Sequence, residues 1–402
     1  MDKIRFLGAE NEISRVPFGS ILKETREKTT VENEDTLLSC AINGIFRNDE
    51  LFSHFRGSST IGYIKVKKND LILSAQNLHL GNANVNLRFE HGIISPAYKV
   101  YRITGAEPEY IAQWVKRPAA NQFFLAATTE GASQCRKNID WDALYRQPIV
   151  LPSSDEQKKI AKLLMSLDSQ IAFEKTEVRK LKDFKSAMLT KMFPKEGKTE
   201  PEIRFPGFTD AWEQRKLGEI ANFSKGVGYS KNDLCEEGTP IILYGRLYTK
   251  YETSIFDVDT FVKGKAGSVY SKGGEVIVPA SGETAEDISI ASVVVKPGIL
   301  LGGDLNIVSP TTEYDSAFLA LTISSGAAHK YLSSLAQGKS VVHLHNADIQ
   351  SVSAKFPTKR EQEKIHLIFG KIDTLITLHQ RMYEKLIDTK KAFLEKLIGG
   401  EK

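Results

Sequence analysis

Two short stretches contain residue types that could bind a nucleotide, but each departs from the motif that it approaches. Gly338-Lys339-Ser340 has the end of a phosphate-binding loop, yet Ser333 stands where that loop requires its first glycine. Lys225-Gly226-Val227-Gly228-Tyr229 is half of a dinucleotide-binding fingerprint, without the third glycine and without a preceding apolar strand. Neither stretch predicts a nucleotide site.

Other catalytic and metal-binding signatures are incomplete as well. Ser95-Pro96-Ala97-Tyr98 lacks the polar first residue and the second proline of the Asn/Asp-Pro-Pro-Tyr/Phe motif of amino-group methyl transfer to DNA. His343 and His345 are two residues apart and would share one face of a strand. A metal pair is conceivable there, although polar contacts at a strand end are more common. We therefore expect a chain that is not an enzyme and holds no metal or cofactor of its own.

Polar side chains suited to nucleic acid gather in both halves of the chain instead. Asn, Gln and Arg can read base edges with two hydrogen bonds, whereas Lys, Ser and backbone amides mostly hold phosphates. The alternative is that they line solvated loops, which are polar in any protein, but the clusters together favour binding. The candidates in the first half are Arg47, Arg56, Gln76, Asn77, His79, Asn82, Arg136 and Lys137. The candidates in the second half are Tyr244, Arg246, Tyr248, Thr249, Ser281, Thr284, Lys339, Ser340, His343 and His345.

The composition is that of an ordinary globular protein with room for two or three domains. The chain has 402 residues, 41% of them hydrophobic, and a formal net charge of +4, which permits a polyanionic partner without requiring one. Cys40, Cys135 and Cys235 form no CxxC pair, which fits a reducing cytoplasm. No apolar run approaches the ~18 residues of a membrane span. We expect a cytoplasmic protein with no membrane partner.

The elements that must position these side chains are revealed by a long internal repeat. Residues 151–193 align with residues 356–398 without a gap, at a constant offset of 205. Pro152 matches Pro357, and Glu156-Gln157 matches Glu361-Gln362. An ungapped match over some forty residues is hard to obtain by chance and indicates that the chain follows one plan twice.

Both repeats are predicted to be long helices that form a coiled coil. Apolar residues recur at alternating intervals of four and three, the period of a coiled-coil seam. Each seam has polar interruptions at the same places, Glu174 and Lys185 in the first and His379 and Lys390 in the second. Two helices buried separately in two cores are the alternative. The principal seam positions are Ile160, Leu164, Leu167, Ile171, Leu181, Ile365, Phe369, Ile372, Ile376 and Leu386.

The segments that precede the helices read as irregular, mostly β domains. Short β-branched runs such as EVIVPASG and LNIVSP alternate with turn residues, and short helices are expected around 108–117 and 315–336. The prediction is an α+β chain: two mostly-β domains separated by two long helices that form an antiparallel coiled coil, in a pseudo-two-fold repeat. The expected boundaries are 1–150 and 212–355 for the domains, 151–195 and 356–402 for the helices, and 196–211 for a linker.

The chain resembles the DNA-specificity subunits of type I restriction–modification systems over nearly its whole length. The most specific segment is PEIRFPGFTDAWEQRKLGEI at 201–220, which is similar to the usual start of a target-recognition domain in that family. LYGRLYTKYE, SGETAEDI, GGDLNIVSP, GIISPAYKV and the P-x(3)-EQ-x-KI helix starts are also similar. One departure is that the first domain has no Trp-containing segment like that at Trp212.

The resemblance implies a non-catalytic subunit that reads a bipartite, asymmetric sequence of double-stranded DNA. Each domain would read one half, and the helices would set the spacer and dock two copies of a modification subunit. S-adenosylmethionine, ATP and Mg²⁺ would be bound by partners, namely the methyltransferase subunits and the restriction/translocase subunits. Two alternatives stay open: a standalone bipartite DNA-binding regulator, and a coiled-coil scaffold that does not bind DNA.

Overall fold

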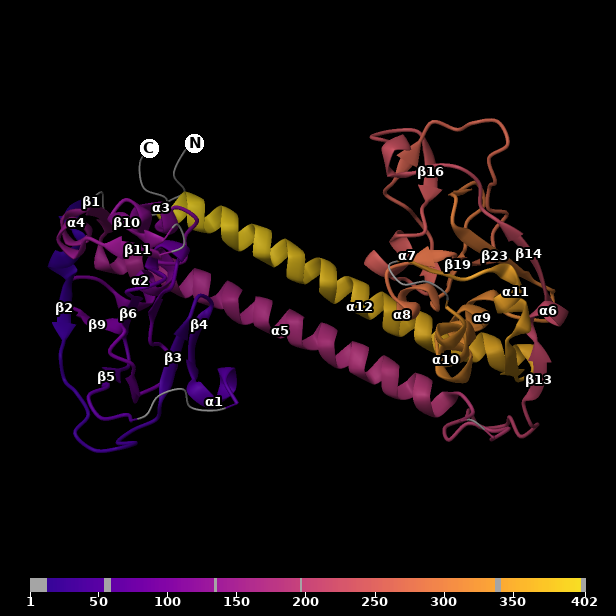
Figure 1. The fold of residues 1–402 in the computed structure, drawn as a ribbon, viewed down its shortest axis with the longest axis horizontal. Coiled ribbons are helices and arrows are strands. Elements are labelled where there is room, and N and C mark those ends of the chain that lie inside the picture. Colours follow the sequence, from indigo (N-terminus) through magenta and orange to yellow (C-terminus); the bar gives the residue numbers. More distant parts are fainter. Residues whose placement is uncertain (1–12, 54–58, 134–135, 196, 337–340, 399–402) are drawn as a thin grey trace. The chain divides into compact units, whose positions relative to one another are not determined.

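A computed structural model describes residues 13–53, 59–133, 136–195, 197–336 and 341–398. The chain divides into two compact units: unit 1 comprises Met1–Glu174 and Met382–Lys402, and unit 2 comprises Lys175–Arg381. Helices α5 (Ser154–Met192) and α12 (Lys359–Phe393) each contribute one end to each unit (Figure 1). Each unit therefore contains one mostly-β domain, the start of one long helix and the end of the other.

The domain of unit 1 is built on an antiparallel sheet of four strands in the order β2-β9-β6-β7. The central strand β6 is buried along its whole length, and Leu71 lies opposite Tyr101 of β9. The strands are β1 (Ile13–Pro17), β2 (Leu22–Thr25), β3 (Leu38–Ala41), β4 (Gly44–Arg47), β5 (Ile64–Lys67), β6 (Asp70–Ser74), β7 (Ala83–Val85), β8 (His91–Ile94), β9 (Tyr98–Ile103), β10 (Thr128–Ser133), β11 (Arg136–Ile139) and β12 (Pro148–Pro152). The helices are η1 (Phe18–Ile21), α1 (Asn48–Leu51), η2 (Leu78–Leu80), α2 (Pro108–Trp114), α3 (Ala120–Leu125) and α4 (Trp141–Arg146).

The domain of unit 2 has a five-stranded sheet in the order β14-β23-β19-β21-β17 and a four-stranded sheet in the order β15-β18-β16-β22. The strands are β13 (Glu213–Lys216), β14 (Ala221–Lys225), β15 (Leu234–Cys235), β16 (Thr239–Ile242), β17 (Ser254–Ile255), β18 (Phe261–Val262), β19 (Glu275–Pro279), β20 (Ser281–Gly282), β21 (Ser292–Val294), β22 (Leu300–Leu301), β23 (Leu305–Pro310), β24 (Val342–His343) and β25 (Ser353–Phe356). The helices are α6 (Leu217–Ile220), η3 (Lys231–Asp233), α7 (Arg246–Thr249), α8 (Ala285–Ile288), α9 (Ser316–Ile323), α10 (Gly326–Leu335) and α11 (Asn346–Ser351).

Each domain is closed in the same way, by pairing its first strand with its last. Strand β1 pairs antiparallel with β12 in unit 1, and β13 pairs antiparallel with β25 in unit 2. A single helical turn, η1 or α6, follows each first strand and buries its two apolar residues. The glycine of each turn packs closely on the last short helix of its domain, α4 or α11. A Cβ on Gly19 would lie 2.7 Å from Tyr145 Cβ, and one on Gly218 would lie 3.2 Å from Gln350 Cβ.

The central strands are anchored alike, although the sequences around them differ. Asp70 and Glu275 are the first residues of β6 and β19, and both are buried. Asp70 accepts a hydrogen bond of 2.8 Å from the amide of Lys67, and Glu275 accepts one of 2.6 Å from the amide of Lys272. Short helices then occur where the sequence indicates them, as α2 in unit 1 and as α9 and α10 in unit 2.

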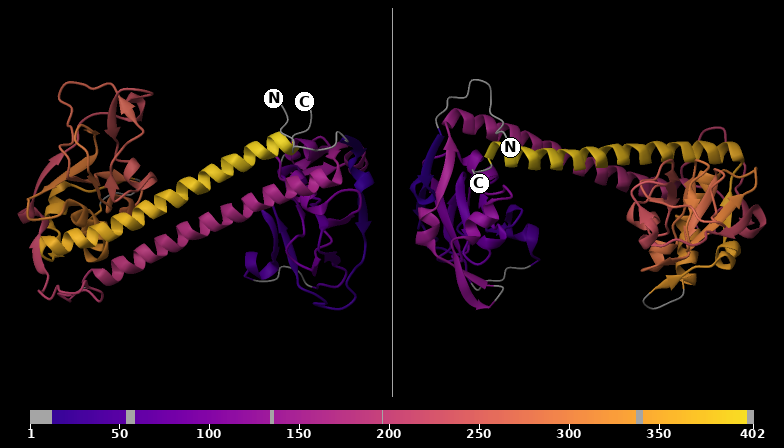
Figure 2. Two further views of the ribbon diagram at one scale, coloured as in Figure 1. Left: turned by 180° about the vertical axis from the view of Figure 1, so that it is seen from behind. Right: turned by 90° about the horizontal axis from the view of Figure 1, so that it is seen from above.

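The ends of the long helices pack antiparallel within each unit. In unit 1, Ile160 and Leu164 near the start of α5 share a core with Leu394. Leu394 begins the short helix η4 (Leu394–Ile398), which directly follows α12. In unit 2, Met192 at the end of α5 shares a core with Ile365 near the start of α12. Figure 2 shows the start of α12 against the orange elements of unit 2. The α+β architecture of two mostly-β domains and two antiparallel long helices is confirmed.

The seam residues follow the heptad pattern in their burial. Ile160, Leu164, Ile365 and Phe369 are at most 1% exposed, and Leu167 and Ile372 are less than 10% exposed. The remaining seam positions, Ile171, Leu181, Ile376 and Leu386, are partly buried. No helix in the described part of the chain is long and apolar enough to cross a membrane.

Candidate nucleic-acid interface

In unit 2, the polar residues singled out from the sequence come together around two short helices, α7 and α8. Tyr244 precedes α7 by two residues and Tyr248 lies within it. Their ring centroids are 6.3 Å apart, and both side chains are partly exposed. Burial, and then the nearby Tyr244 and acidic residues of the α8 segment, raise the pKa of Tyr248 above its ordinary value. Tyr248 therefore stays a neutral hydroxyl at physiological pH and offers both a ring face and a hydrogen-bonding group.

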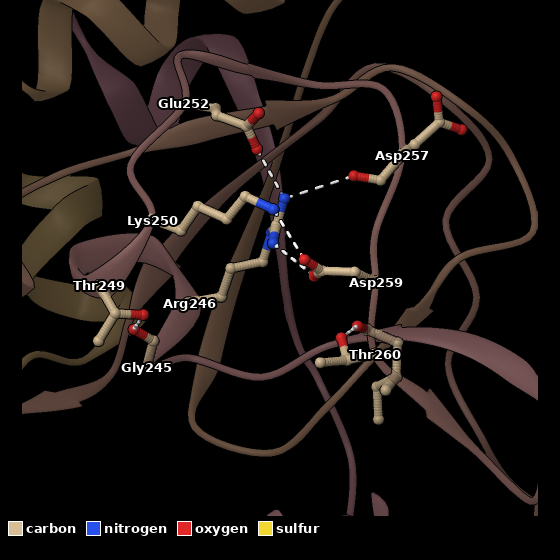
Figure 3. Close-up of polar contacts among 9 residues, drawn as sticks. Gly245, Arg246, Thr249, Lys250, Glu252, Asp257, Asp259 and Thr260 are labelled. Atoms are coloured by element: carbon tan, nitrogen blue, oxygen red, sulfur yellow. Dashed lines mark hydrogen bonds and ion pairs between the residues drawn. The ribbon is translucent and has the colours of Figure 1, made fainter. Parts of the chain in front are cut away.

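Arg246, between the two tyrosines, is directed into the protein. Its guanidinium donates to Glu252 at 2.6 Å, to Asp259 at 3.1 Å and to the backbone oxygen of Asp257 at 3.4 Å (Figure 3). The side chain is only 9% exposed. Lys250 donates to the same Asp259 at 2.8 Å, and this hydrogen bond is the main cause that holds the pKa of Asp259 below its usual range. Arg246 thus braces the segment 252–259 against α7.

Thr249 and Thr284 are also engaged by the backbone around them. The hydroxyl of Thr249 donates to the carbonyl of Gly245 at 2.8 Å within the same turn (Figure 3). Thr284 caps α8, because its hydroxyl accepts the amide of Asp287 at 3.1 Å. Both side chains are exposed, so a second hydrogen bond to a ligand is sterically open to them.

Strands β20 and β24 bring Ser281 and His343 together. The two residues are direct partners in the strand pair, and Ser281 Oγ lies 3.1 Å from His343 Nδ1. His345 is exposed and begins α11, where its amide donates to Asp348 at 2.8 Å. Lys339 and Ser340 lie outside the described residues.

In unit 1, the candidates separate into exposed and interior residues. Gln76 and Asn77 are exposed directly after the central strand β6, and His79 follows in η2. Asn82 is buried and donates at 3.1 Å to the carbonyl of Cys40, so its amide supports the fold. Arg47 is exposed beside Asp49, at 3.2 Å.

The remaining candidates of unit 1 lie on or near β11. The backbone of Arg136 belongs to this strand, and Lys137 is partly exposed on it. Arg56 lies outside the described residues. Gln76 and Asn77 are therefore the two adjacent exposed candidates in the described part of the unit, and they follow the buried strand β6.

Candidates occupy the same place in both domains. Gln76, Asn77 and Thr284 are exposed there, whereas Ser281 is buried. Gln76 and Asn77 follow the central strand β6, just as Ser281 and Thr284 follow the central strand β19. Since both strands begin at a buried acidic anchor, the two polar groups are carried by equivalent elements. The same position in the fold therefore presents different side chains in the two domains.

Sequence reasoning did not find the role of the repeated Glu-Gln pair. Gln157 accepts the amide of Glu107 at 2.9 Å and donates to the carbonyl of Pro152 at 2.8 Å. Gln362 makes the same two bonds, with Asp315 at 2.9 Å and Pro357 at 2.8 Å. The offset of 205 was the available signal, but it could not show that each glutamine fastens the start of a long helix to a short helix of its domain.

Comparison with known proteins agrees with this architecture. A family model described as a type I restriction modification DNA specificity domain matches residues 209–387. The MjaVIII specificity subunit of Methanocaldococcus jannaschii is 24% identical over 290 residues, covering 69% of this chain and 67% of that protein. The MjaX specificity subunit of the same organism is 24% identical over 375 residues, covering 88% and 78%.

Residues 209–387 thus match a type I restriction–modification DNA specificity domain, and the chain is similar to type I specificity subunits over most of its length. The crystal structure of such an S subunit from M. genitalium superposes with a TM-score of 0.66 at 13% identity, covering 100% of both chains, which supports the fold. The matched segment, 209–387, includes the whole domain of unit 2 and most of α12.

Proposed function

We propose that this chain is a specificity subunit and reads a bipartite, asymmetric sequence in double-stranded DNA, with one mostly-β domain on each half. The observation that carries the proposal is that two domains of one plan present different polar groups after the same central strand. Different side chains at equivalent places read different bases, whereas identical ones would read a palindrome.

The exposed residues supply suitable chemistry for each half. Gln76 and Asn77 carry amides that can pair with an adenine edge through two hydrogen bonds. The hydroxyls of Thr284 and Tyr248 can donate or accept toward bases or phosphates, while the buried Ser281 lies against His343. Arg246 acts indirectly, by holding the tyrosine-bearing turn in place.

The reaction itself belongs to partners in this proposal. The chain docks two copies of a modification subunit, which supply methyl transfer with S-adenosylmethionine, and restriction/translocase subunits, which use ATP and Mg²⁺. This division agrees with the incomplete catalytic motifs of the sequence. The complex works on DNA in the cytoplasm.

Methylome sequencing of cells with and without this gene tests the proposal. We expect one split methylated motif, with two unlike halves and a fixed spacer, that disappears with the gene. A complex of the purified chain and its modification subunit should also bind DNA with an affinity that falls steeply between low and moderate salt, through counterion release. If every methylated motif remained in cells without the gene, the proposal would be rejected. The absence of salt-dependent DNA binding would favour a scaffold.

A further inference from the structure

Two lysine–aspartate pairs join the long helices, one in each unit. In unit 2, Lys185 Nζ of α5 lies 2.5 Å from Asp373 Oδ1 of α12. In unit 1 the helices exchange roles, and Lys390 of α12 contacts Asp168 of α5. The lysines correspond to each other at the repeat offset of 205, and so do the aspartates. The lysines are also the polar interruptions of the two seams.

Each pair also contacts the domain of its own unit. Lys185 donates to the hydroxyl of Thr253 at 3.1 Å and lies 5.3 Å from the centre of the Tyr251 ring. Asp168 accepts from the side-chain amide of Gln113, on α2, at 2.9 Å. Each pair is therefore a junction of three elements: α5, α12 and one domain.

The junctions are shielded enough for their partners to matter. The Lys185 and Lys390 side chains are 13% and 17% exposed, and their partners Asp373 and Asp168 are 23% and 45% exposed. The second carboxylate oxygen of Asp373 is buried without a hydrogen bond from the described residues. A charge in such surroundings loses hydration, so an unsuitable partner is penalised more than at an open surface.

A shift of α12 along α5 by one heptad, toward either end, would separate each aspartate from its lysine. If α12 moved by one heptad, Asp373 would face Val178 or Met192 in place of Lys185, and Asp168 would face Tyr383 or Leu397. The apolar seam positions do not discriminate in this way, because aliphatic side chains pack on one another in several registers. The two junctions therefore penalise the shifted registers.

We propose that the Lys185–Asp373 and Lys390–Asp168 junctions set the register of the helix pair and thereby fix the length of the DNA spacer between the half-sites. This inference rests on the proposed function. The four residues are positioning residues: they touch no base, and they act through the placement of the two domains. We expect these residues to contribute more to the specificity for one spacer length than to the stability of the fold. Buried polar groups in other helix seams act in the same way.

The test replaces all four residues by leucine in the full chain, purified with its modification subunit. The substrates are DNA duplexes that contain both half-sites and spacers of different lengths. We expect the melting temperature to be kept or raised, while the preference for the native spacer falls at least tenfold against spacers about three base pairs longer or shorter, the length of one heptad. The matched control replaces two lysines and two aspartates outside the seam, Lys182, Asp183, Lys385 and Asp388, by leucine, and should keep the preference.

A second pair of variants keeps the test decisive if the leucine variant does not fold. Lys185→Asp with Lys390→Asp should lose the spacer preference, and adding Asp373→Lys and Asp168→Lys should restore it. An unchanged preference in the leucine variant, or no restoration by the exchange, would overturn the inference and assign the register to the packing of the helix ends. Failure of the unmodified complex to methylate any split sequence would instead reject the proposed function.

Discussion

Arg204 holds the buried carboxylate of Glu361 through two hydrogen bonds, both of 2.8 Å. The arginine belongs to the linker before β13, and the glutamate lies in the first turn of α12. Glu361 is 1% exposed and Arg204 14%. A hydrogen bond to this carboxylate raises the pKa of Arg204, so the guanidinium keeps its charge at the pH values at which the protein folds. The linker is thereby fastened to the helix start by a charge pair that excludes water.

Replacing Arg204 by alanine should therefore destabilise unit 2 strongly. Removal of one partner leaves a buried, unpaired carboxylate, which costs about 3 kcal/mol or more. Urea unfolding of the purified chain measures this change. Arg215→Ala is the matched control, because Arg215 is 47% exposed and should change stability by less than about 0.5 kcal/mol. Equal effects of the two substitutions would contradict the assigned role.

The glutamines at the two helix starts should be equivalent in energy. Gln157→Ala and Gln362→Ala each remove two hydrogen bonds and leave a backbone amide and a carbonyl without their partner. We expect a loss of about 1–3 kcal/mol for each, and additive effects in the double variant because the residues belong to different units. Lys159→Ala, at an exposed position beside Gln157, is the control. Denaturant titration measures the free energy of unfolding, which should fall in both glutamine variants and stay nearly unchanged in the lysine control.

The two turn glycines should differ in their tolerance of a methyl group. Gly19→Ala places its Cβ 2.7 Å from Tyr145 Cβ, whereas Gly218→Ala meets Gln350 Cβ at 3.2 Å. Gly19→Ala should therefore lower stability by about 1–3 kcal/mol and Gly218→Ala by less. Gly370→Ala, in the interior of α12 with open space around it, should raise stability by about 0.5–1 kcal/mol. Thermal unfolding of the three variants would contradict this account if their order differed.

Arg246 should influence only the half-site that the second domain reads. Arg246→Ala releases segment 252–259 from α7 and should weaken modification of that half while leaving the other half and the spacer unchanged. Arg246→Lys should recover part of the activity, since lysine keeps the charge but cannot reach two carboxylates in the same geometry. Methylation of duplexes with single-base changes in each half measures the effect. Relaxed recognition of both halves would contradict it.

The carboxylate of Asp259, beside Arg246, should contribute to the stability of the fold in a way that is lost in acid. Its pKa is lowered in the folded protein, so its stabilising effect is present above the unfolded value of about 3.9 and is lost as the pH falls through the folded value. Between pH 5 and pH 3, the free energy of unfolding of the unmodified protein should fall by more than that of the Asp259→Asn variant. Parallel pH curves for the two proteins would show that the pair with Lys250 contributes nothing.

The helices and their pairing could be predicted from the sequence because their signal is periodic and repeated. A seam of alternating threes and fours fixes which face is buried, and the offset of 205 identifies equivalent residues in both helices. The partner of each polar seam residue could not be predicted in this way. Lys185 and Asp373 are far apart in sequence, and only the antiparallel packing brings them together.

The site could be predicted less well because residue type does not determine exposure. Asn82 and Arg246 have the chemistry of base-reading residues, but the first is in the interior and the second is held by acidic neighbours. Gln76 and Ser281 could not be recognised as equivalent either, because the only shared signal, a buried acidic residue before an apolar strand, is short. The base-contact role of the exposed candidates stays a prediction.

The central claim, one domain for each half of the target, is tested most directly by a domain exchange. Residues 221–345 would be replaced by the corresponding segment of another specificity subunit, and the methylated motif of the resulting complex would be sequenced. The account predicts that one half of the motif changes while the other half and the spacer stay the same. A motif in which both halves change, or neither does, would contradict it.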